Sequence, residues 1–238
     1  MIPILSLFTL FTSFFSSIIF WRLYSSYRKN KITNIGYFAA TYGSLALFFL
    51  VASVPGLFSV DPFWIQASFI FSYIPLFATS FFLMSISLDT LAFKGIKKYF
   101  LVVILFSLIL TTVLGAFLSG SPFPNKIGSN FYYWKEGTPA WLQALNGIIV
   151  SFVTFGAGIF FWFGGLKSKV TIVRTRGFIL GSGVILEGVG AFLNYVLAPR
   201  IEFAMLPLIA GLSAILGLIT LFFGIYYRPK DNEEGSAL

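Results

Sequence analysis

The chain has 238 residues, of which 58% are hydrophobic and only 10% are charged, and it contains neither cysteine nor histidine. A typical soluble domain carries about 25% charged residues, so this composition excludes an ordinary soluble fold. Without cysteine or histidine, disulfides, thiol nucleophiles and histidine-bound haem or zinc are excluded too. We therefore expect no enzymatic activity, no catalytic residue, no metal and no cofactor.

Seven apolar stretches follow one another along the chain. They are continuously apolar rather than alternating, which favours helices over the strands of a barrel. Each has about the 20 residues that a helix needs to cross a bilayer. They lie near 2–21, 36–54, 63–88, 99–118, 141–164, 177–197 and 204–227. The sequence predicts an all-α, seven-transmembrane helix bundle at 1–228, followed by a short disordered tail at 229–238.

The first apolar stretch could also be a signal peptide, which would be removed. A signal peptide has basic residues before a short apolar core and a cleavage site of small residues after it. Here no basic residue precedes the stretch, which has full membrane length and ends at Trp21 and Arg22. We expect it to be retained as the first span.

The basic residues between the spans predict the orientation. All but three of the 16 lysines and arginines follow the first, third, fifth and seventh spans, and the exceptions are Lys126, Lys135 and Arg200. Because basic loops stay in the cytoplasm, we expect an outside N-terminus and a cytoplasmic C-terminus in the cell membrane. The net charge of +8 then reflects topology and attraction to anionic lipids, with no nucleic acid as a partner. A cytoplasmic or membrane protein that docks on the basic inner loops, above all 165–176, is the alternative.

The longest loop, residues 119–140, is predicted to face outside. It is rich in glycine, proline and asparagine and carries the aromatic run Phe131–Trp134. This run is typical of an aromatic belt at the lipid–water boundary. The other interpretation is a lid over an outward-facing pocket, because long loops are often functional.

Glu187 is the most informative single residue, because it lies near the middle of the sixth predicted span. A charged side chain at that depth is costly and is expected to face the protein interior, paired or protonated. Small and polar residues recur around it at helical spacing, namely Gly183, Gly190, Ala191, Asn194 and Ala198. We expect Glu187 to serve as a ligand contact, a proton acceptor or a switch.

Two further spans add polar residues at a similar depth. Asn146 and Ser151 lie in the fifth span, and Gln66 and Tyr73 lie in the third, ahead of Pro75. Together with the sixth span they predict a cavity open to the outside. The alternative is that serine, threonine and glycine stripes only allow helices to pack closely, with Ser151, Thr154, Gly183 and Gly190 as packing residues.

Two short segments resemble a known family. Ser87–Leu91, followed by Lys97 and Lys98, and Arg174–Gly181 resemble junctions in the seven-transmembrane sensory modules of bacterial histidine kinases and cyclases. The resemblance implies a sensory role, although we expect no output domain of that family within these 238 residues. Asp89, within the first segment, is expected to pair with Lys94 or to cap the next helix.

The sequence thus favours a receptor-like membrane protein that binds a small or lipid-like ligand and signals to a cytoplasmic or membrane partner. The predicted ligand-binding residues are Glu187, Asn194, Asn146, Tyr73, Gln66 and Ser151. One alternative is a small proton-coupled transporter or channel that uses Glu187. The other is a structural subunit of a larger membrane complex.

Overall fold

The computed structural model describes residues 2–59, 61–90, 94–127, 129–201, 203 and 205–227, without the side chains of Thr90 and Lys94. In this part of the chain it contains seven helices that are long and apolar enough to cross a membrane, as predicted. They are α1 (Ile4–Asn30), α2 (Thr33–Phe58), α3 (Pro62–Thr90), α4 (Lys94–Leu118), α5 (Ala140–Lys167), α6 (Thr171–Ala191) and α7 (Leu206–Tyr226). A short π-helix, η1 (Phe192–Leu197), continues α6. The predicted tail at 229–238 lies outside the described residues.

Most of the helices extend beyond the apolar stretches that predicted them, whereas α7 lies within its stretch. Helix α1, for example, runs to Asn30 rather than to residue 21, and it ends where Lys31 adopts a left-handed conformation with φ of 55°. Hydropathy marks only the part of a helix that lies in the hydrocarbon core of the bilayer. The backbone hydrogen bonds of the helix continue into the headgroup region. Helix α1 begins at Ile4, two residues after the start of the predicted span, because Ile2–Pro3 form a strand.

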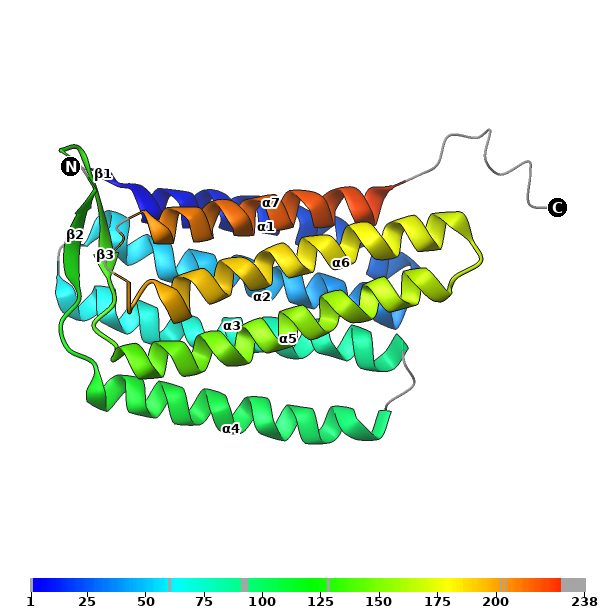
Figure 1. The fold of residues 1–238 in the computed structure, drawn as a ribbon, viewed down its shortest axis with the longest axis horizontal. Helices are drawn as coiled ribbons and strands as arrows, with labels where there is room; N and C mark the ends of the chain where they lie inside the picture. The colour runs from blue at the N-terminus through cyan, green and yellow to red at the C-terminus, as the bar shows by residue number, and fades with distance from the viewer. Residues whose placement is uncertain are drawn as a thin grey trace.

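Six of the helices form a closed ring. Each packs on its neighbours in the order α1, α2, α3, α5, α6, α7, and α7 meets α1 again through few contacts. Helix α4 lies outside this ring, against α3 and the edge of α5 (Figure 1). The α1–α7 seam is therefore the loosest part of the ring.

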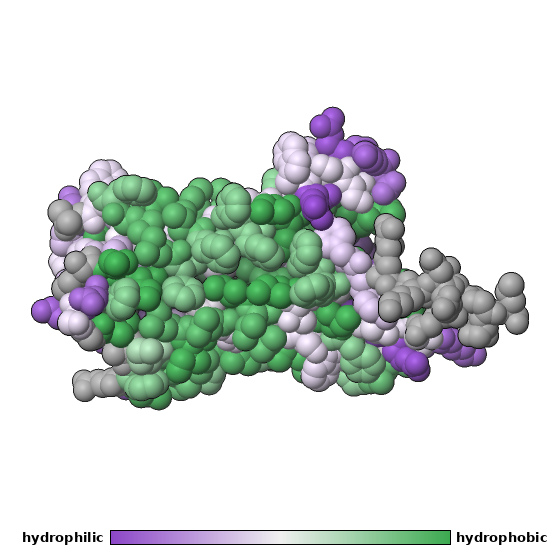
Figure 2. All heavy atoms as spheres, turned by 90° about the horizontal axis from the view of Figure 1, so that it is seen from above, coloured by the Kyte–Doolittle hydropathy of each residue, from purple (hydrophilic) through white to green (hydrophobic). Residues whose placement is uncertain are grey.

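Hydrophobic side chains cover the middle of the bundle on the face shown in Figure 2, and hydrophilic ones gather at its two ends. Large apolar side chains such as Phe106, Phe117 and Phe152 are more than half exposed. An apolar band of this kind suits contact with lipid and not with water. The arrangement agrees with a multi-pass membrane protein.

A small three-stranded sheet covers one end of the bundle, called here the sheet end. Its strands are β1 (Ile2–Pro3), β2 (Phe123–Ile127) and β3 (Phe131–Lys135), in the order β1-β3-β2. Strand β1 is parallel to β3 and β2 is antiparallel to it. The predicted all-α fold is therefore confirmed, and the small sheet is an addition at this end, where the α4–α5 connection folds over the helices (Figure 1). The connections α1–α2 and α5–α6 lie at the opposite end.

Glycines allow α5 and α6 to touch through their backbones. A Cβ atom on Gly165 would lie 2.9 Å from the carbonyl oxygen of Arg174 and 3.3 Å from the Cα of Gly177. The neighbouring Gly164 has open space at the same position. Backbone atoms cannot move aside as a flexible side chain can. A larger side chain should therefore fit at Gly164 but not at Gly165.

We expect Gly165→Val to destabilise the bundle by about 1–3 kcal/mol, the usual effect of overpacking. Gly164→Val should leave the stability close to that of the parent. Thermal unfolding of the detergent-purified variants measures both effects. An equal loss in the two variants would contradict the close α5–α6 contact.

Candidate functional site

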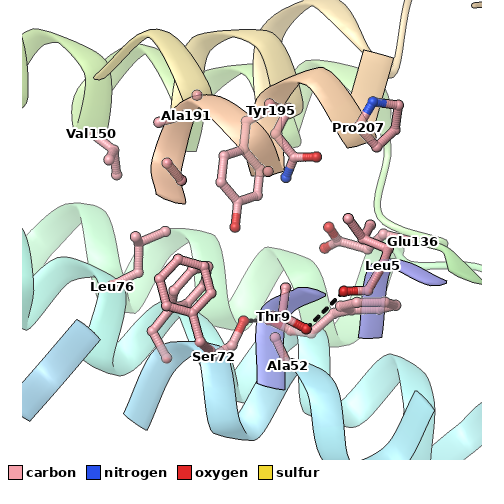
Figure 3. A pocket seen from close by; sticks show the side chains of 18 of the residues that line it. Leu5, Thr9, Ala52, Ser72, Leu76, Glu136, Val150, Ala191, Tyr195 and Pro207 are labelled. Carbon is pink, nitrogen blue, oxygen red and sulfur yellow. Dashed lines mark hydrogen bonds between the residues drawn. The ribbon is translucent and has the colours of Figure 1, made fainter. Parts of the chain in front are cut away.

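A cavity of about 200 Å³ lies inside the ring. All six ring helices and the end of β3 contribute to its walls, whereas no described residue of α4 does. Most of the wall is apolar or aromatic, and a few polar side chains project into the space (Figure 3). Concave, mostly apolar cavities with a few converging polar groups are typical ligand sites.

Glu187 projects into this cavity from α6, so its predicted inward orientation is confirmed. It also borders a second void of about 10 Å³, which Thr41 and Tyr42 line from α2. A void of that size holds about one water molecule. The Glu187 Oε1 atom and the Tyr42 hydroxyl are buried, and neither has a hydrogen-bond partner among the described residues.

Glycines on both sides of Glu187 bring α6 and α7 together. A Cβ atom on Gly183 would lie 2.9 Å from the Gly217 carbonyl oxygen, and one on Gly190 would lie 2.8 Å from that of Ala210. A Cβ on Gly217 would lie 2.8 Å from Cγ of Glu187. The glycine stripe thus serves packing, as the alternative interpretation predicted, and Gly217 leaves room for the carboxylate side chain.

The π-helix η1 turns two successive residues toward the cavity. Its wider turn is visible in the hydrogen bond of 2.9 Å from the Ala198 N–H to the Leu193 carbonyl oxygen, five residues back. Such turns often occur at functional sites. Both Asn194 and Tyr195 line the cavity. The sequence predicted Asn194 but not Tyr195, although Tyr195 follows Glu187 by eight residues and so lies on the same helical face.

Glu136, which was not predicted, lines the cavity where β3 leads into α5. Its Oε1 atom accepts hydrogen bonds from the hydroxyl groups of Tyr73 and Thr138. Its Oε2 atom has no hydrogen bond to any described residue, and it is not among the fully enclosed polar atoms. Burial raises the pKa of Glu136 above its usual 4.5, although the two donors oppose that shift.

Gln66 anchors this segment rather than lining the cavity. Its Oε1 atom accepts a hydrogen bond of 2.8 Å from the Gly137 N–H, and its Nε2 donates one of 3.0 Å to Thr138 Oγ1. Gln143 Nε2 donates to the Thr138 carbonyl oxygen at 2.7 Å. Side chains from α3 and α5 thus hold the residues that follow Glu136, and Gln66 acts on the cavity through them.

The structure brings together three of the six predicted ligand-binding residues. Glu187, Asn194 and Tyr73 line the same cavity, whereas Gln66, Asn146 and Ser151 do not. On α5 the residues that face the cavity are Gln143, Val150 and Thr154.

Asn146 and Ser151 lie on opposite flanks of that α5 stripe and do not line the cavity. Asn146 is fully buried, and its amide atoms have no hydrogen-bond partner among the described residues. The Ser151 hydroxyl donates to the Gly188 carbonyl oxygen at 3.4 Å. Ser151 thus joins α5 to α6, as the packing interpretation predicted.

Asp89 belongs to a separate cluster at the end opposite the sheet. Its Oδ2 atom pairs with Lys97 Nζ at 3.0 Å, and the same ammonium group donates to the Tyr37 hydroxyl at 2.6 Å. The predicted pairing with Lys94 cannot be compared, because that side chain is not described. The cluster joins α2, α3 and α4 and is distant from the cavity in the fold.

No family model, curated protein or solved structure matches this chain. The resemblance to bacterial sensory modules therefore stays a prediction. Among the described residues, no three carboxylates come together as metal ligands would.

Proposed function

We propose that the protein is a receptor-like membrane protein that binds a small ligand in the cavity between its helices. The single observation that carries this proposal is the cavity itself, into which Glu187, Asn194 and Tyr73 project from two sides of the ring. An acidic side chain at membrane depth usually marks a functional site. Glu187 is the residue we expect to contact the ligand.

The proposed orientation puts the sheet end outside and the opposite end in the cytoplasm of the cell. The ends of α1 and α5 that carry Lys29, Lys31 and Lys167 lie away from the sheet (Figure 1). Basic loops are retained in the cytoplasm. The ligand would then enter from outside the cell, and the basic loops would meet any cytoplasmic partner.

Signalling would require that the ligand favour one of two helix packings by its differential affinity for them. The cavity spans the α1–α7 seam, with Leu5 and Thr9 on one side and Pro207 and Gly211 on the other. At the opposite end, the Arg176 guanidinium donates to the Tyr227 carbonyl oxygen at 2.7 Å. A shift at the seam would therefore reach the cytoplasmic ends of α6 and α7.

Glu187→Gln tests this proposal. A thermal-shift screen of small molecules and lipids on the purified parent supplies a ligand, and titration calorimetry gives its affinity for each variant. We expect Glu187→Gln to change that affinity by about tenfold or more, since a desolvated polar contact is lost, while the protein stays folded. Asp61→Asn is the control, because Asp61 is an exposed residue outside the cavity. A ligand affinity that Glu187→Gln leaves unaltered would contradict the site.

One observation favours proton-coupled transport as a second candidate. Glu187 borders both the main cavity and the smaller void beside Tyr42, and its Oε1 atom has no partner among the described residues. A carboxyl group between two hydrated spaces could carry a proton between them. Uptake into proteoliposomes under a pH gradient, present in the parent and absent in Glu187→Gln, would favour this function.

A further inference from the structure

We infer that the ligand of this cavity is a small organic cation with an apolar body, and that Glu136 binds its ammonium group. This inference rests on the proposed function, because it names the class of ligand for the same cavity. It goes beyond that function in assigning the charged contact to the loop residue Glu136, at the sheet end, rather than to Glu187.

The first argument is the lack of a counter-ion for the carboxylates of the cavity. Within the described residues the one ion pair joins Lys97 to Asp89, far from the cavity. Lys135 also borders the cavity, but its Nζ atom lies 5.7 Å from the centre of the Phe123 ring and contacts that ring instead. A buried charge without a partner is unfavourable. A cationic ligand would supply the positive charge that these carboxylates lack.

The second argument is the geometry of Glu136. Its Oε1 atom is held by Tyr73 and Thr138, which fixes the carboxylate, while its Oε2 atom has no hydrogen bond to a described residue. Because this carboxylate is already held in place, binding a charged group to it costs less free energy for ordering the side chain. Gln66 supports this position from the other side of the segment.

Aromatic side chains are the third argument. Tyr73, Tyr195 and Trp134 line the same cavity as Glu136. Figure 3 shows the Tyr195 phenol and the Glu136 carboxylate reaching into one space from different elements. Aromatic faces attract ammonium groups, and aromatic cages recognise quaternary amines. A carboxylate beside aromatic rings is thus a combination that favours a cation over an anion.

The remaining walls and the volume define the body of the ligand. Leu5, Leu76, Val150 and Ala191 are apolar and face the cavity (Figure 3). An engineered apolar cavity of about 150 Å³ holds benzene, so about 200 Å³ has room for one ring and a short chain. An arylalkylamine of the size of phenethylamine meets these limits.

The experiment compares three probes of similar shape by titration calorimetry on the full chain in nanodiscs at neutral pH. They are phenethylamine, which is cationic, phenethyl alcohol, which is neutral, and hydrocinnamate, which is anionic. We expect the amine to bind at least about tenfold more tightly than the alcohol, and the anion not to bind. Glu136→Gln should weaken the amine about tenfold and leave the alcohol unchanged. Asp61→Asn, which removes an exposed carboxylate outside the cavity, should change neither.

Several results would overturn the inference. Equal affinity for amine and alcohol would show a cavity without a cation site, which leaves the proposed function standing. An equal loss in Glu136→Gln and Asp61→Asn would show an effect of surface charge only. If none of the probes binds the parent, the inference is wrong, and the proposed function is judged by its own screen. If Glu136→Gln does not fold, Tyr195→Leu replaces it, because it removes an aromatic ring and leaves the Glu136 hydrogen bonds in place.

Discussion

Replacing Ala191 with phenylalanine should abolish ligand binding while the bundle stays folded. Ala191 faces the cavity, and its side chain points into the open space between the two sides of the ring (Figure 3). A phenyl ring there would take up much of the volume of about 200 Å³. Because the ring fills a void rather than a packed core, little overpacking is expected. We expect a loss in affinity of about a hundredfold or more, since the ligand and the ring cannot both fit.

Ala116→Phe is the matched control for this change. Ala116 is exposed on α4, which lies outside the ring, so the larger side chain should meet lipid and leave the affinity unaltered. Titration calorimetry with a ligand from the screen measures both variants, and thermal unfolding checks that each is folded. Ligand binding that survives in a folded Ala191→Phe protein would place the binding site elsewhere.

Gln66→Leu should destabilise the segment that carries Glu136. The substitution leaves the buried Gly137 N–H without its acceptor and removes a donor to Thr138. An unsatisfied buried polar group costs about 1–3 kcal/mol. Hydrogen exchange of residues 131–138, followed by mass spectrometry, should become faster, and amine affinity should fall because the carboxylate is no longer fixed.

Thr220→Val is the comparison for the loss of a hydrogen bond. The Thr220 hydroxyl is exposed and bonds only within its own helix, to the Leu216 carbonyl oxygen. We expect it to leave the exchange of residues 131–138 unaltered. Equal exchange in Gln66→Leu and in the parent would contradict the anchoring role.

The helices could be predicted because the penalty for burying polar groups in lipid acts on each stretch of sequence by itself. The sheet could not be predicted in the same way. It depends on the pairing of Ile2 with Phe131 and of Pro3 with Tyr132, which are far apart in the chain. The length of the long loop suggested a lid as the second interpretation, beside an aromatic belt, and the structure places Tyr133 and Trp134 at the cavity.

Glu187 and Glu136 differ in the same way: the first depends on its own stretch of sequence, and the second on contacts between distant segments. Glu187 could be predicted to face inward, because a carboxylate at membrane depth has few other options. Glu136 lies in a loop, where an acidic residue is ordinary, and only the folding of that loop over the bundle buries part of it. Tyr195 could have been predicted, because it follows Glu187 by eight residues and so lies on the same helical face, but only the small and polar residues of that face were considered.

Ser151 and Asn146 show the limit of helical periodicity. The polar residues of the fifth span suggested one polar face. Only the middle of that face lines the cavity, at Gln143, Val150 and Thr154. Which part of a stripe faces a void depends on how the neighbouring helices are rotated. That rotation follows from close contacts such as Gly158 with Gly181, which involve two distant segments.

The most direct test of the central claim is the reaction of single cysteines with a membrane-impermeant reagent. The parent has no cysteine, so Ala191→Cys and Ala157→Cys each introduce one thiol, the first in the cavity and the second in the fully buried core. A trimethylammonium methanethiosulfonate is added to intact cells. It reaches only the outer side of the membrane, where the N-terminus is expected to lie. The account predicts fast modification of Ala191→Cys, slowed by a bound ligand, and none of Ala157→Cys. An unreactive Ala191→Cys, or one that reacts only from the side of the basic loops, would contradict an outward-opening cavity.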